Sequence, residues 1–366
     1  MSSELSAVVT SRLRRARRMA RAAIDLSGLC LRGHARRLRF RPGQTVGPDG
    51  VVVVAPVDDY SPHFKQTRDV IVTDHDYVTL KGGTLFFNDP TYAIDRPRYL
   101  PQTWVARVDV DTCFGLLLMR RSNYYHDVKD VFFSMYRFNR EHGASIPILV
   151  FGDLSRRDRD MLAVLGIRNP LLRVPKFVAV HVKRYLTLSP RAEFALRPPR
   201  TDDERAADRT FRDYLDVFTS AFAPAGRVRA RRKIFVTRRP PYGRVPANVD
   251  EIEASFAARG YEVVDFARHP LAEQVAIAAG SAAVAGLHGA GFANMFFAPP
   301  GTPLLEIFTH DWTGDCYQWL CESFGHPYEK VVVDTQAGPG QGFTLPLPAL
   351  EASLRRFDER VKERAR

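Results

Sequence analysis

Apolar and polar positions alternate most regularly in the second half of the chain. Short continuous apolar runs there predict buried strands, and the amphipathic stretches between them carry helix start and stop signals. The predicted strands are 233–238, 261–266, 282–286, 303–308 and 328–334, and the predicted helices are 248–259, 271–279 and 317–324. This order predicts a parallel sheet with helices on both faces. Asn248, three residues before Glu251, predicts a capping box at the first helix.

The first half shows a weaker pattern with shorter apolar runs. It predicts strands at 51–55, 70–73, 84–87, 103–108, 114–119, 146–151 and 177–182, and helices at 123–140 and 155–165. Thr201 or Asp202 is expected to cap a helix that runs to about residue 222. The stretch 223–232, rich in Arg, Ala, Gly and Pro, predicts a domain junction. A last helix, 347–361, is expected to pack back across the first domain.

Length and composition are those of a globular protein with two domains. The chain has 366 residues, of which 45% are hydrophobic and 26% are charged. Because single cores stop growing near roughly 250–300 residues, this length favours two domains. We expect a basic arm over 1–45, a first domain over 46–225, a second domain over 226–340 and a carboxy-terminal helix over 341–366.

Three features bear on the compartment. The four cysteines, Cys30, Cys113, Cys316 and Cys321, form no Cys-x-x-Cys pair, so they indicate neither a zinc site nor a disulfide framework. No apolar run approaches the ~20 residues of a membrane span. No apolar segment of a secretory signal follows the arginine-rich start. We therefore expect a cytoplasmic protein.

Most of the net charge of +12 lies in the amino-terminal arm. Between Arg12 and Arg41 there are eleven arginines and one acid, Asp25. A protein that tracks a nucleic-acid backbone carries its charge over the folded surface, so this distribution argues against nucleic acid as a partner for the body of the chain. A basic helix within 11–41 could contact anionic lipid at the inner membrane surface, or the arm could be a solvated tail.

The most specific motif is a glycine turn between the predicted strand 282–286 and a helix-like segment, 292–297. It reads Gly286-Leu287-His288-Gly289-Ala290-Gly291-Phe292-Ala293-Asn294. A strand that leads through glycines into a helix leaves the first N–H groups of the helix without partners, and these donors favour a phosphate. No Lys-Ser/Thr follows, as a P-loop requires, and the glycine spacing is not that of a dinucleotide-binding turn. The alternative is a tight connection that binds no ligand.

A second cluster of polar and aromatic residues lies at the start of the predicted helix 123–140. It comprises Asn123, Tyr124, Tyr125, His126, Asp127 and Asp130. His126 and Asp130 share one helix face, so Asp130 could orient His126 or could itself take a proton from a hydroxyl. Tyr124 and Tyr125 would suit packing on a sugar ring, and Arg137 lies on the same face as Asp130. The alternative is a helix start capped by Asn123 with a surface His–Asp pair.

Together the two motifs, Asn-Tyr-Tyr-His-Asp and then Gly-x-His-Gly-Ala-Gly-x-x-Asn, make a more specific pattern than either alone. In this order the chain resembles glycosyltransferase family 61, which includes plant xylosyltransferases and many bacterial members of polysaccharide biosynthesis. The resemblance implies an α/β fold of the GT-B type, with two Rossmann-like domains that face each other across a cleft. It implies that the first domain binds the acceptor and that the second binds a nucleotide sugar.

The resemblance also implies roles for residues that match the family's motifs. Arg238 follows a strand and would face the donor phosphates, because the planar fork of arginine binds phosphate oxygens in pairs. Arg239 is a second candidate contact, and Arg244 lies in the loop that follows. The other donor-binding candidates are His288, Gly289, Ala290, Gly291, Asn294 and Glu306. His288 could bond the phosphates or the leaving group, Asn294 could touch the nucleotide or tie down the turn, and Glu306 could accept bonds from ribose hydroxyls. Tyr124, Tyr125 and Arg137 would bind the acceptor.

Family 61 chemistry is inverting and generally independent of metal, so the resemblance implies no cofactor beyond the nucleotide sugar, expected to be a UDP sugar. One base would remove the proton of the acceptor. Asp130 is the first candidate, His126 the second, and Asp127 the third because it would point away on the helix. The tripeptides Asp74-His75-Asp76 and Asp109-Val110-Asp111 match the metal motif of another glycosyltransferase fold, but neither follows the nucleotide-binding domain which that fold requires.

We therefore expect a hexosyl- or pentosyltransferase that extends a glycan or lipid-linked glycan in cell-surface polysaccharide biosynthesis. Residues 11–41 would give it a peripheral contact with the membrane, and no nucleic acid is expected as a partner. The alternative is a module in which the basic arm binds an anionic surface or nucleic acid. A nucleotide-dependent ligase is a further alternative, but the chain lacks a P-loop lysine.

Overall fold

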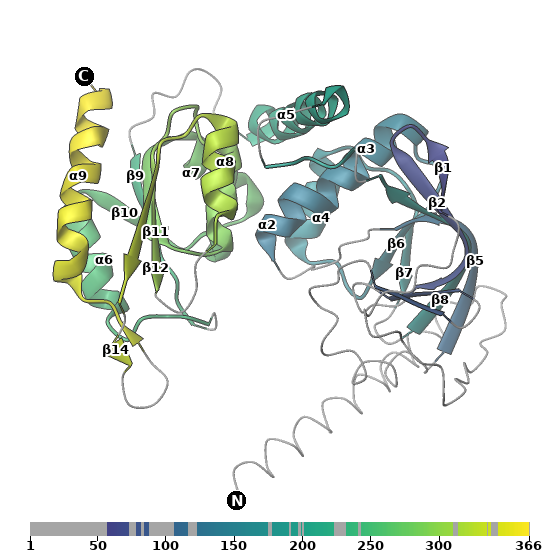
Figure 1. Cartoon of the computed structure of the whole chain (residues 1–366), viewed down its shortest axis with the longest axis horizontal. Coiled ribbons are helices and arrows are strands. Elements are labelled where there is room, and N and C mark those ends of the chain that lie inside the picture. The colour runs from purple at the N-terminus through teal and green to yellow at the C-terminus, as the bar shows by residue number, and fades with distance from the viewer. Residues whose placement is uncertain are drawn as a thin grey trace, which may run out of the picture. The chain divides into compact units, whose positions relative to one another are not determined.

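In the computed structural model the chain forms two compact units (Figure 1). It describes residues 57–72, 78–81, 84–87, 106–115, 123–174, 178–189, 192–196, 199, 201–222, 232–240, 243–309, 314–334, 336–337 and 343–365. The basic arm, the expected strand 51–55 and most of the expected strand 114–119 lie outside these residues. In the described part of the chain, no helix has both the length and the apolar character to cross a membrane.

The second unit is built on a parallel sheet, which has five strands among the described residues. They are β9 (Arg232–Val236), β10 (Tyr261–Val264), β11 (Ser281–Leu287), β12 (Leu304–Thr309) and β13 (Tyr328–Val333). Their order is β10-β9-β11-β12-β13, and every neighbouring pair is parallel. The predicted strands and their parallel arrangement are thus confirmed.

Helices cover both faces of this sheet. They are α6 (Val249–Ala258), α7 (Leu271–Ala279), α8 (Cys316–Phe324) and α9 (Leu347–Ala365). In Figure 1, α6 and α9 lie on one side of the strands and α7 and α8 on the other. Phe256 of α6 and Leu354 and Phe357 of α9 share one apolar core with Phe235 of β9. The expectation that the last helix packs across the first domain is wrong, because its apolar face completes this core.

Further elements belong to the second unit. They are α5 (Asp202–Phe222), η5 (Phe266–Arg268), η6 (Ala290–Phe297), and the strand pair β14 (Gln336–Ala337) and β15 (Phe343–Thr344). The predicted helix-like segment 292–297 is η6, a 3₁₀ helix that begins two residues earlier. Each N–H of a 3₁₀ helix bonds the carbonyl three residues back, so the groups at its start find no partner within the helix.

The strand order places a topological switch point between β9 and β11. β10 lies beyond β9 and β12 lies beyond β11, so the connections that leave these two central strands run to opposite sides. In open α/β sheets, ligands bind in the crevice outside the carboxyl ends of such a pair. Arg238 follows β9 closely and His288 follows β11 directly. Both candidate donor-binding segments therefore lie at the edge where this fold binds ligands.

The first unit contains a mixed sheet, with eight strands among the described residues. They are β1 (Val57–Ser61), β2 (Phe64–Val72), β3 (Val78–Lys81), β4 (Thr84–Phe87), β5 (Ala106–Phe114), β6 (Ile148–Phe151), β7 (Leu171–Val174) and β8 (Val178–Leu188). β8, β5, β6 and β7 form a parallel part, and β1 to β4 extend it with antiparallel pairs. The α/β class is confirmed, but only part of this sheet matches a Rossmann-like pattern.

The chain passes between the two units several times before it completes the second. Residues 121–129 and 157–166 belong to the second unit together with 194–366, whereas 130–156 and 167–193 belong to the first. The predicted helix 123–140 is therefore divided. It consists of α2 (Tyr124–His126), the π-helical segment η3 (Asp127–Phe132) and α3 (Phe133–His142). α4 (Arg156–Val164) confirms the helix predicted at 155–165 and also spans a boundary.

Two helix starts test the capping predictions. At α5, Thr201 Oγ1 accepts a bond from the Glu204 N–H at 3.2 Å and Glu204 Oε2 accepts one from the Thr201 N–H at 3.3 Å, so the predicted start is confirmed. α6 also begins where predicted, but the Asn248 side chain makes no cap. It bonds the N–H and the C=O of Leu345 instead, at 3.1 and 2.9 Å. Asn248 thus connects the start of α6 to the chain before α9.

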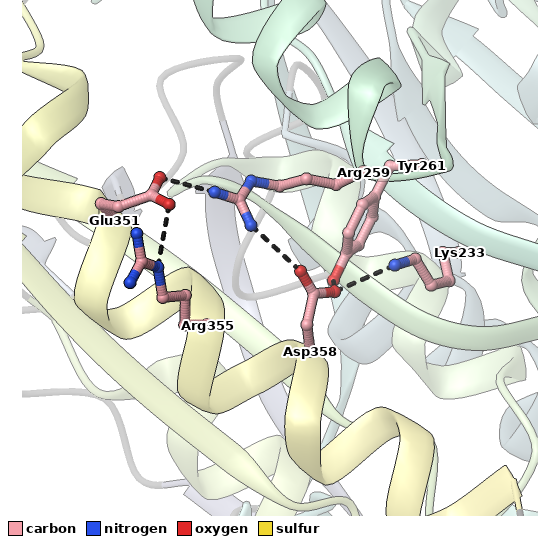
Figure 2. Close-up of polar contacts among 6 residues, drawn as sticks. All are labelled: Lys233, Arg259, Tyr261, Glu351, Arg355 and Asp358. Atoms are coloured by element: carbon pink, nitrogen blue, oxygen red, sulfur yellow. Dashed lines mark hydrogen bonds and ion pairs between the residues drawn. The ribbon is translucent and has the colours of Figure 1, made fainter.

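A polar network attaches α9 to the sheet and to α6 (Figure 2). Asp358 accepts bonds from Lys233 Nζ at 2.9 Å and from the Tyr261 hydroxyl at 3.1 Å. Arg259, at the end of α6, reaches Asp358 at 3.4 Å and Glu351 at 2.5 Å. Lys233 lies on β9 and Tyr261 on β10, so one carboxylate of α9 holds two neighbouring strands and the end of a helix.

Candidate functional site

Three backbone amides of the glycine turn have no hydrogen-bond partner among the residues that the structure describes. The His288 N–H bonds the Ile307 carbonyl at 2.9 Å, which continues the pairing of β11 with β12, and the Phe292 N–H bonds the Gly289 carbonyl at 3.1 Å. Between them, the amides of residues 289–291 donate to no acceptor in the part of the chain that the structure describes. These residues are only half-buried, and N–H groups without partners at the start of a helix favour an anion.

The glycines of the turn are required by crowding. A Cβ at Gly286 would lie 2.5 Å from the Val236 carbonyl oxygen, and one at Gly291 would lie 2.9 Å from Val236 Cγ1. At Gly289 the nearest atom would be Nη1 of Arg238, at 3.0 Å. Gly289 has a φ of 178°, which any residue can adopt. The absence of side chains thus lets β9, the turn and the arginine approach each other closely.

Arg238 lies against this turn with part of its guanidinium unused. Its Nη1 donates to the His288 carbonyl at 2.8 Å, while its buried Nε has no partner among the described residues. Burial, and then the positive charge of Arg244, lower the pKa of Arg238. A buried N–H without a partner is costly, and two neighbouring cations repel each other, so an anion at this position would relieve both.

Arg244 contributes positive charge from the loop after β9. Its backbone has a φ of 60°, in the left-handed region that residues other than glycine adopt only at a cost. Partial desolvation lowers its pKa. From the sequence, Arg244 could be named only as a loop residue, because its approach to Arg238 depends on a backbone turn that the sequence does not announce.

Arg239, the other arginine of this loop, has a different environment. Its Nε donates to Glu253 Oε1 at 2.9 Å, and its Nη2 contacts Glu253 Oε2 at 2.5 Å and Asp250 Oδ1 at 2.6 Å. These bonds raise its pKa. Arg239 is thus compensated by carboxylates of α6, and the geometry favours Arg238 over Arg239 as the contact for a ligand anion.

His288 is held by a fully buried carboxylate. Glu306 of β12 has no exposed surface, and its Oε1 lies 2.5 Å from His288 Nδ1. Its Oε2 accepts a bond from the Tyr328 hydroxyl at 2.7 Å. Burial and the adjacent Glu306 raise the pKa of Tyr328, which keeps this hydroxyl protonated. Since both oxygens of Glu306 are occupied within the protein, the geometry favours a positioning role toward His288 over a contact with ribose.

Tyr317 of α8 is a member of the site that the sequence analysis missed. Its ring centroid lies 5.5 Å from that of His288 and 5.4 Å from those of Phe292 and Tyr125. Burial raises its pKa well above the ordinary value. Its local sequence is that of any amphipathic helix, so no signal in the chain marks it.

The two tyrosines of the early motif lie in the interior of the second unit. Asn123 caps their helix, with its Oδ1 accepting a bond from the Tyr125 N–H at 3.1 Å. The Tyr124 hydroxyl donates to Asn294 Oδ1 at 3.1 Å, and Asn294 Nδ2 donates to the Gly291 carbonyl at 3.0 Å. Tyr125 packs on Tyr317 and on Phe296, at a centroid distance of 6.3 Å from the latter. The structure therefore brings the early and late motifs together, and Asn294 ties down the turn.

The candidate bases differ in their surroundings. Asp127 is buried, and its Oδ2 accepts a bond from Arg157 Nη2 at 2.8 Å. His126 and Asp130 are half-buried. The π-helical segment η3 begins directly after His126, so the spacing of an ordinary α-helix does not apply between His126 and Asp130. π-helical segments occur frequently at functional sites.

Arg137 belongs to the interior of the first unit. Only 3% of its side chain is exposed. Its Nη1 donates to the Ala192 carbonyl and its Nε to Glu141 Oε1, both at 2.8 Å. These bonds give Arg137 a structural setting, and an acceptor would have to displace them in order to reach the guanidinium.

In the described ranges, no three or more His, Cys, Asp or Glu side chains gather as metal ligands. Of the two tripeptides, Asp74-His75-Asp76 lies outside those ranges. Asp111 of the other lies in β5 and accepts a bond from Lys183 at 3.3 Å. That ion pair lowers the pKa of the Asp111 carboxyl.

Fold and site together define an α/β protein with a glycine turn and an arginine at the switch point of a parallel sheet. The family model described as Glycosyltransferase 61 matches residues 100–305, more than half of the chain and a range that holds both motifs. The chain therefore belongs to glycosyltransferase family 61, and it is a glycosyltransferase. The resemblance inferred from the two motifs is confirmed. A comparison with curated proteins gives no match.

Family membership places the protein among enzymes that use a nucleotide-sugar donor and a glycan acceptor. The match does not include the basic arm. The alternative of a binding module built on that arm is thus without support from the comparison.

Proposed function

We propose that the diphosphate of a nucleotide sugar binds at the edge of β9 and β11, where the chain transfers the sugar with inversion. The observation that carries the proposal is the pairing of three unused amides, 289–291, with the partly unpartnered guanidinium of Arg238. Backbone donors and an arginine fork are the two groups that bind phosphate oxygens most effectively. Their position at the switch point agrees with the general rule for open α/β sheets.

Transfer with inversion is a single in-line displacement. An acceptor hydroxyl oxygen forms a bond to the anomeric carbon of the sugar as the bond from that carbon to the diphosphate oxygen breaks. The leaving diphosphate keeps the electron pair of the broken bond, and Arg238 with the amides of the turn would stabilise its charge. His288, oriented by Glu306, would donate a hydrogen bond to the same leaving group.

The proton of the acceptor hydroxyl needs a base in this scheme. Asp130 is the first candidate and His126 the second, because both are half-buried and lie in the early motif. Asp127 is the weakest candidate, since Arg157 already holds its carboxylate.

Asp130→Asn should abolish transfer and leave donor binding intact, as measured by turnover and by calorimetry with a nucleoside diphosphate. Full activity in this variant would exclude Asp130 as the base.

The finer assignments extend the same proposal. The donor is a UDP sugar, such as a UDP-linked xylose or N-acetylglucosamine. No metal takes part, since the cations of the site neutralise the diphosphate. The acceptor is a glycan, either a growing cell-surface polysaccharide or its lipid-linked precursor, met by a cytoplasmic enzyme at the membrane surface. The two-lobed GT-B arrangement, in which the first domain binds the acceptor, belongs to this proposal and rests on the family alone.

A thermal-shift panel of nucleotide sugars and nucleoside diphosphates, with and without EDTA, tests the donor and the metal together. A ligand that binds only the folded state raises the melting temperature in proportion to the logarithm of its concentration. We expect stabilisation by UDP and by a UDP sugar that EDTA does not remove. Stabilisation that disappears with EDTA would contradict metal independence, and a panel without any response would contradict the donor site.

A further inference from the structure

A hydrogen bond joins two motifs that lie far apart in the sequence. The Tyr124 hydroxyl and Asn294 Oδ1 are 3.1 Å apart, and the side chains are 6% and 2% exposed. On its other side, Asn294 Nδ2 donates to the Gly291 carbonyl at 3.0 Å and approaches Gln274 Oε1 at 3.4 Å. Asn294 therefore lies between Tyr124 and the turn whose amides are proposed to bind the diphosphate.

The chemistry of these groups fixes the orientation of the Asn294 amide. The Gly291 carbonyl can only accept a hydrogen bond, so the Nδ2 group of Asn294 must face this carbonyl. Oδ1 of Asn294 must then face Tyr124. An oxygen buried in that position requires a donor, which the Tyr124 hydroxyl supplies. Burial raises the pKa of Tyr124, so the hydroxyl keeps the proton that it donates.

Tyr124 is itself held firmly in the second unit. The Arg157 guanidinium lies over its ring, 4.7 Å from the centroid, and pairs with Asp127 at 2.8 Å. In addition, the Tyr214 hydroxyl donates to the Val128 carbonyl at 2.8 Å, which attaches the same segment to α5. A donor fixed in this way can hold the Asn294 amide in one orientation.

We infer that Tyr124 is a positioning residue of the diphosphate site and acts through Asn294 on the glycine turn. Asn294 Nδ2 holds the Gly291 carbonyl in its hydrogen bond, and because each carbonyl is part of a rigid peptide plane, this also restricts the neighbouring turn. The amides of residues 289–291 then stay directed toward the ligand. The inference rests on the proposed function and assigns part of the early motif to the donor, where sequence reasoning assigned it to the acceptor.

Tyr124→Phe in the full chain tests the inference, since it removes the hydroxyl and keeps the ring. The probes are inorganic pyrophosphate and UDP, measured by calorimetry. We expect both to bind about three- to tenfold more weakly, the factor that one buried hydrogen bond contributes. The KM for the donor should rise by a similar factor, and the KM for the acceptor should not change.

Tyr214→Phe is the matched control, because it removes a buried hydroxyl that bonds the same segment but not Asn294. Its affinity for pyrophosphate should fall clearly less than that of Tyr124→Phe, because the hydrogen bond from Tyr124 to Asn294 stays in place. A second variant, Asn294→Asp, places an oxygen against the Gly291 carbonyl and should weaken pyrophosphate binding as well. When Tyr124→Phe is added to Asn294→Asp, the further loss of affinity for pyrophosphate should be smaller than the loss that Tyr124→Phe causes alone. The reason is that the two residues act through the same series of hydrogen bonds.

The outcomes separate this inference from the proposed function. Pyrophosphate binding that is equal in the unmodified chain and in Tyr124→Phe would overturn the inference and leave the donor site in place. Equal losses in Tyr124→Phe and Tyr214→Phe would also overturn it, because they would indicate general destabilisation. If the unmodified chain bound neither pyrophosphate nor UDP, the proposed function and the inference would both be wrong.

Discussion

At the scale of single residues, the site depends on which polar groups the protein itself satisfies. Arg239 is occupied by Glu253 and Asp250, whereas its neighbour Arg238 keeps a buried N–H without a partner among the described residues. Adjacent arginines thus differ in their capacity to bind a ligand. The sequence could name both arginines but could not separate them, because the separation depends on carboxylates one helix away.

This pair of arginines gives the most direct mutational comparison. Arg238→Ala should weaken the binding of a nucleoside diphosphate roughly 10- to 100-fold, since hydrogen bonds to charged groups contribute about 1.5–3 kcal/mol. Arg239→Ala removes the same side chain from the next position and should change the affinity by less than about twofold. Calorimetry with UDP measures both constants. A larger loss in the Arg239 variant would reverse the assignment.

Glu306 makes a different kind of contribution, because it acts through His288. Glu306→Gln keeps the shape and removes the charge behind the imidazole, so we expect kcat to fall about 10- to 100-fold with a smaller change in the KM of the donor. Tyr328→Phe removes only the second hydrogen bond of the Glu306 carboxylate, so it should lower kcat less than Glu306→Gln does. Steady-state kinetics on both variants checks this order. An unchanged kcat in Glu306→Gln would contradict a positioning role.

At the scale of elements, the sequence predicts best where the pattern is set locally. β11 and β12 are buried along almost their whole length and therefore appear as short apolar runs. The edge strands β10 and β13 have exposed positions but enough apolar residues to be located as well. The π-helical turn of η3 was not foreseen, because a π-helix arises from packing and its residues fit an α-helix equally well. Tyr317 and the role of Glu306 escaped prediction for a related reason. Their partners come from other elements, and only the sheet order shows which elements are neighbours.

The connection of α9 to the sheet is testable at this scale. Asp358→Asn weakens the bonds to Lys233 and Arg259, so we expect a loss of about 1–2 kcal/mol in unfolding free energy. Glu359→Gln, at the adjacent exposed position, should stay within about 0.5 kcal/mol. Chemical denaturation followed by tryptophan fluorescence measures both. Equal stability of the two variants would show that the apolar face of α9 alone attaches it.

The same network has a defined dependence on pH. The hydrogen bond from Arg259 lowers the pKa of Glu351 below its value in the unfolded chain. The stabilisation from this carboxylate is therefore complete above the unfolded pKa, and it is lost as the pH falls through the lowered, folded value. The attachment of α9 should consequently weaken only in acid.

At the scale of the whole molecule, family membership and the location of the charge argue for separate roles of arm and body. The family match begins at residue 100, well after the arginine-rich segment. Removal of residues 1–41 should therefore leave donor hydrolysis or transfer in solution unchanged and should reduce binding to anionic lipid vesicles. Vesicle sedimentation and turnover assays check the two effects. A loss of solution activity on removal of the arm would show that the arm serves the catalytic body.

The order of segments along the chain also limits how this protein can be divided. The unit that carries the glycine turn includes 121–129 and 157–166 as well as 194–366, so no single cut separates it from the other unit. A fragment that began at residue 226 would lack Tyr124, Arg157 and α5, and it would expose the buried amide of Asn294 to water. One recombination crossover therefore cannot exchange this unit alone, because it either leaves part of the unit behind or carries segments of the first unit with it.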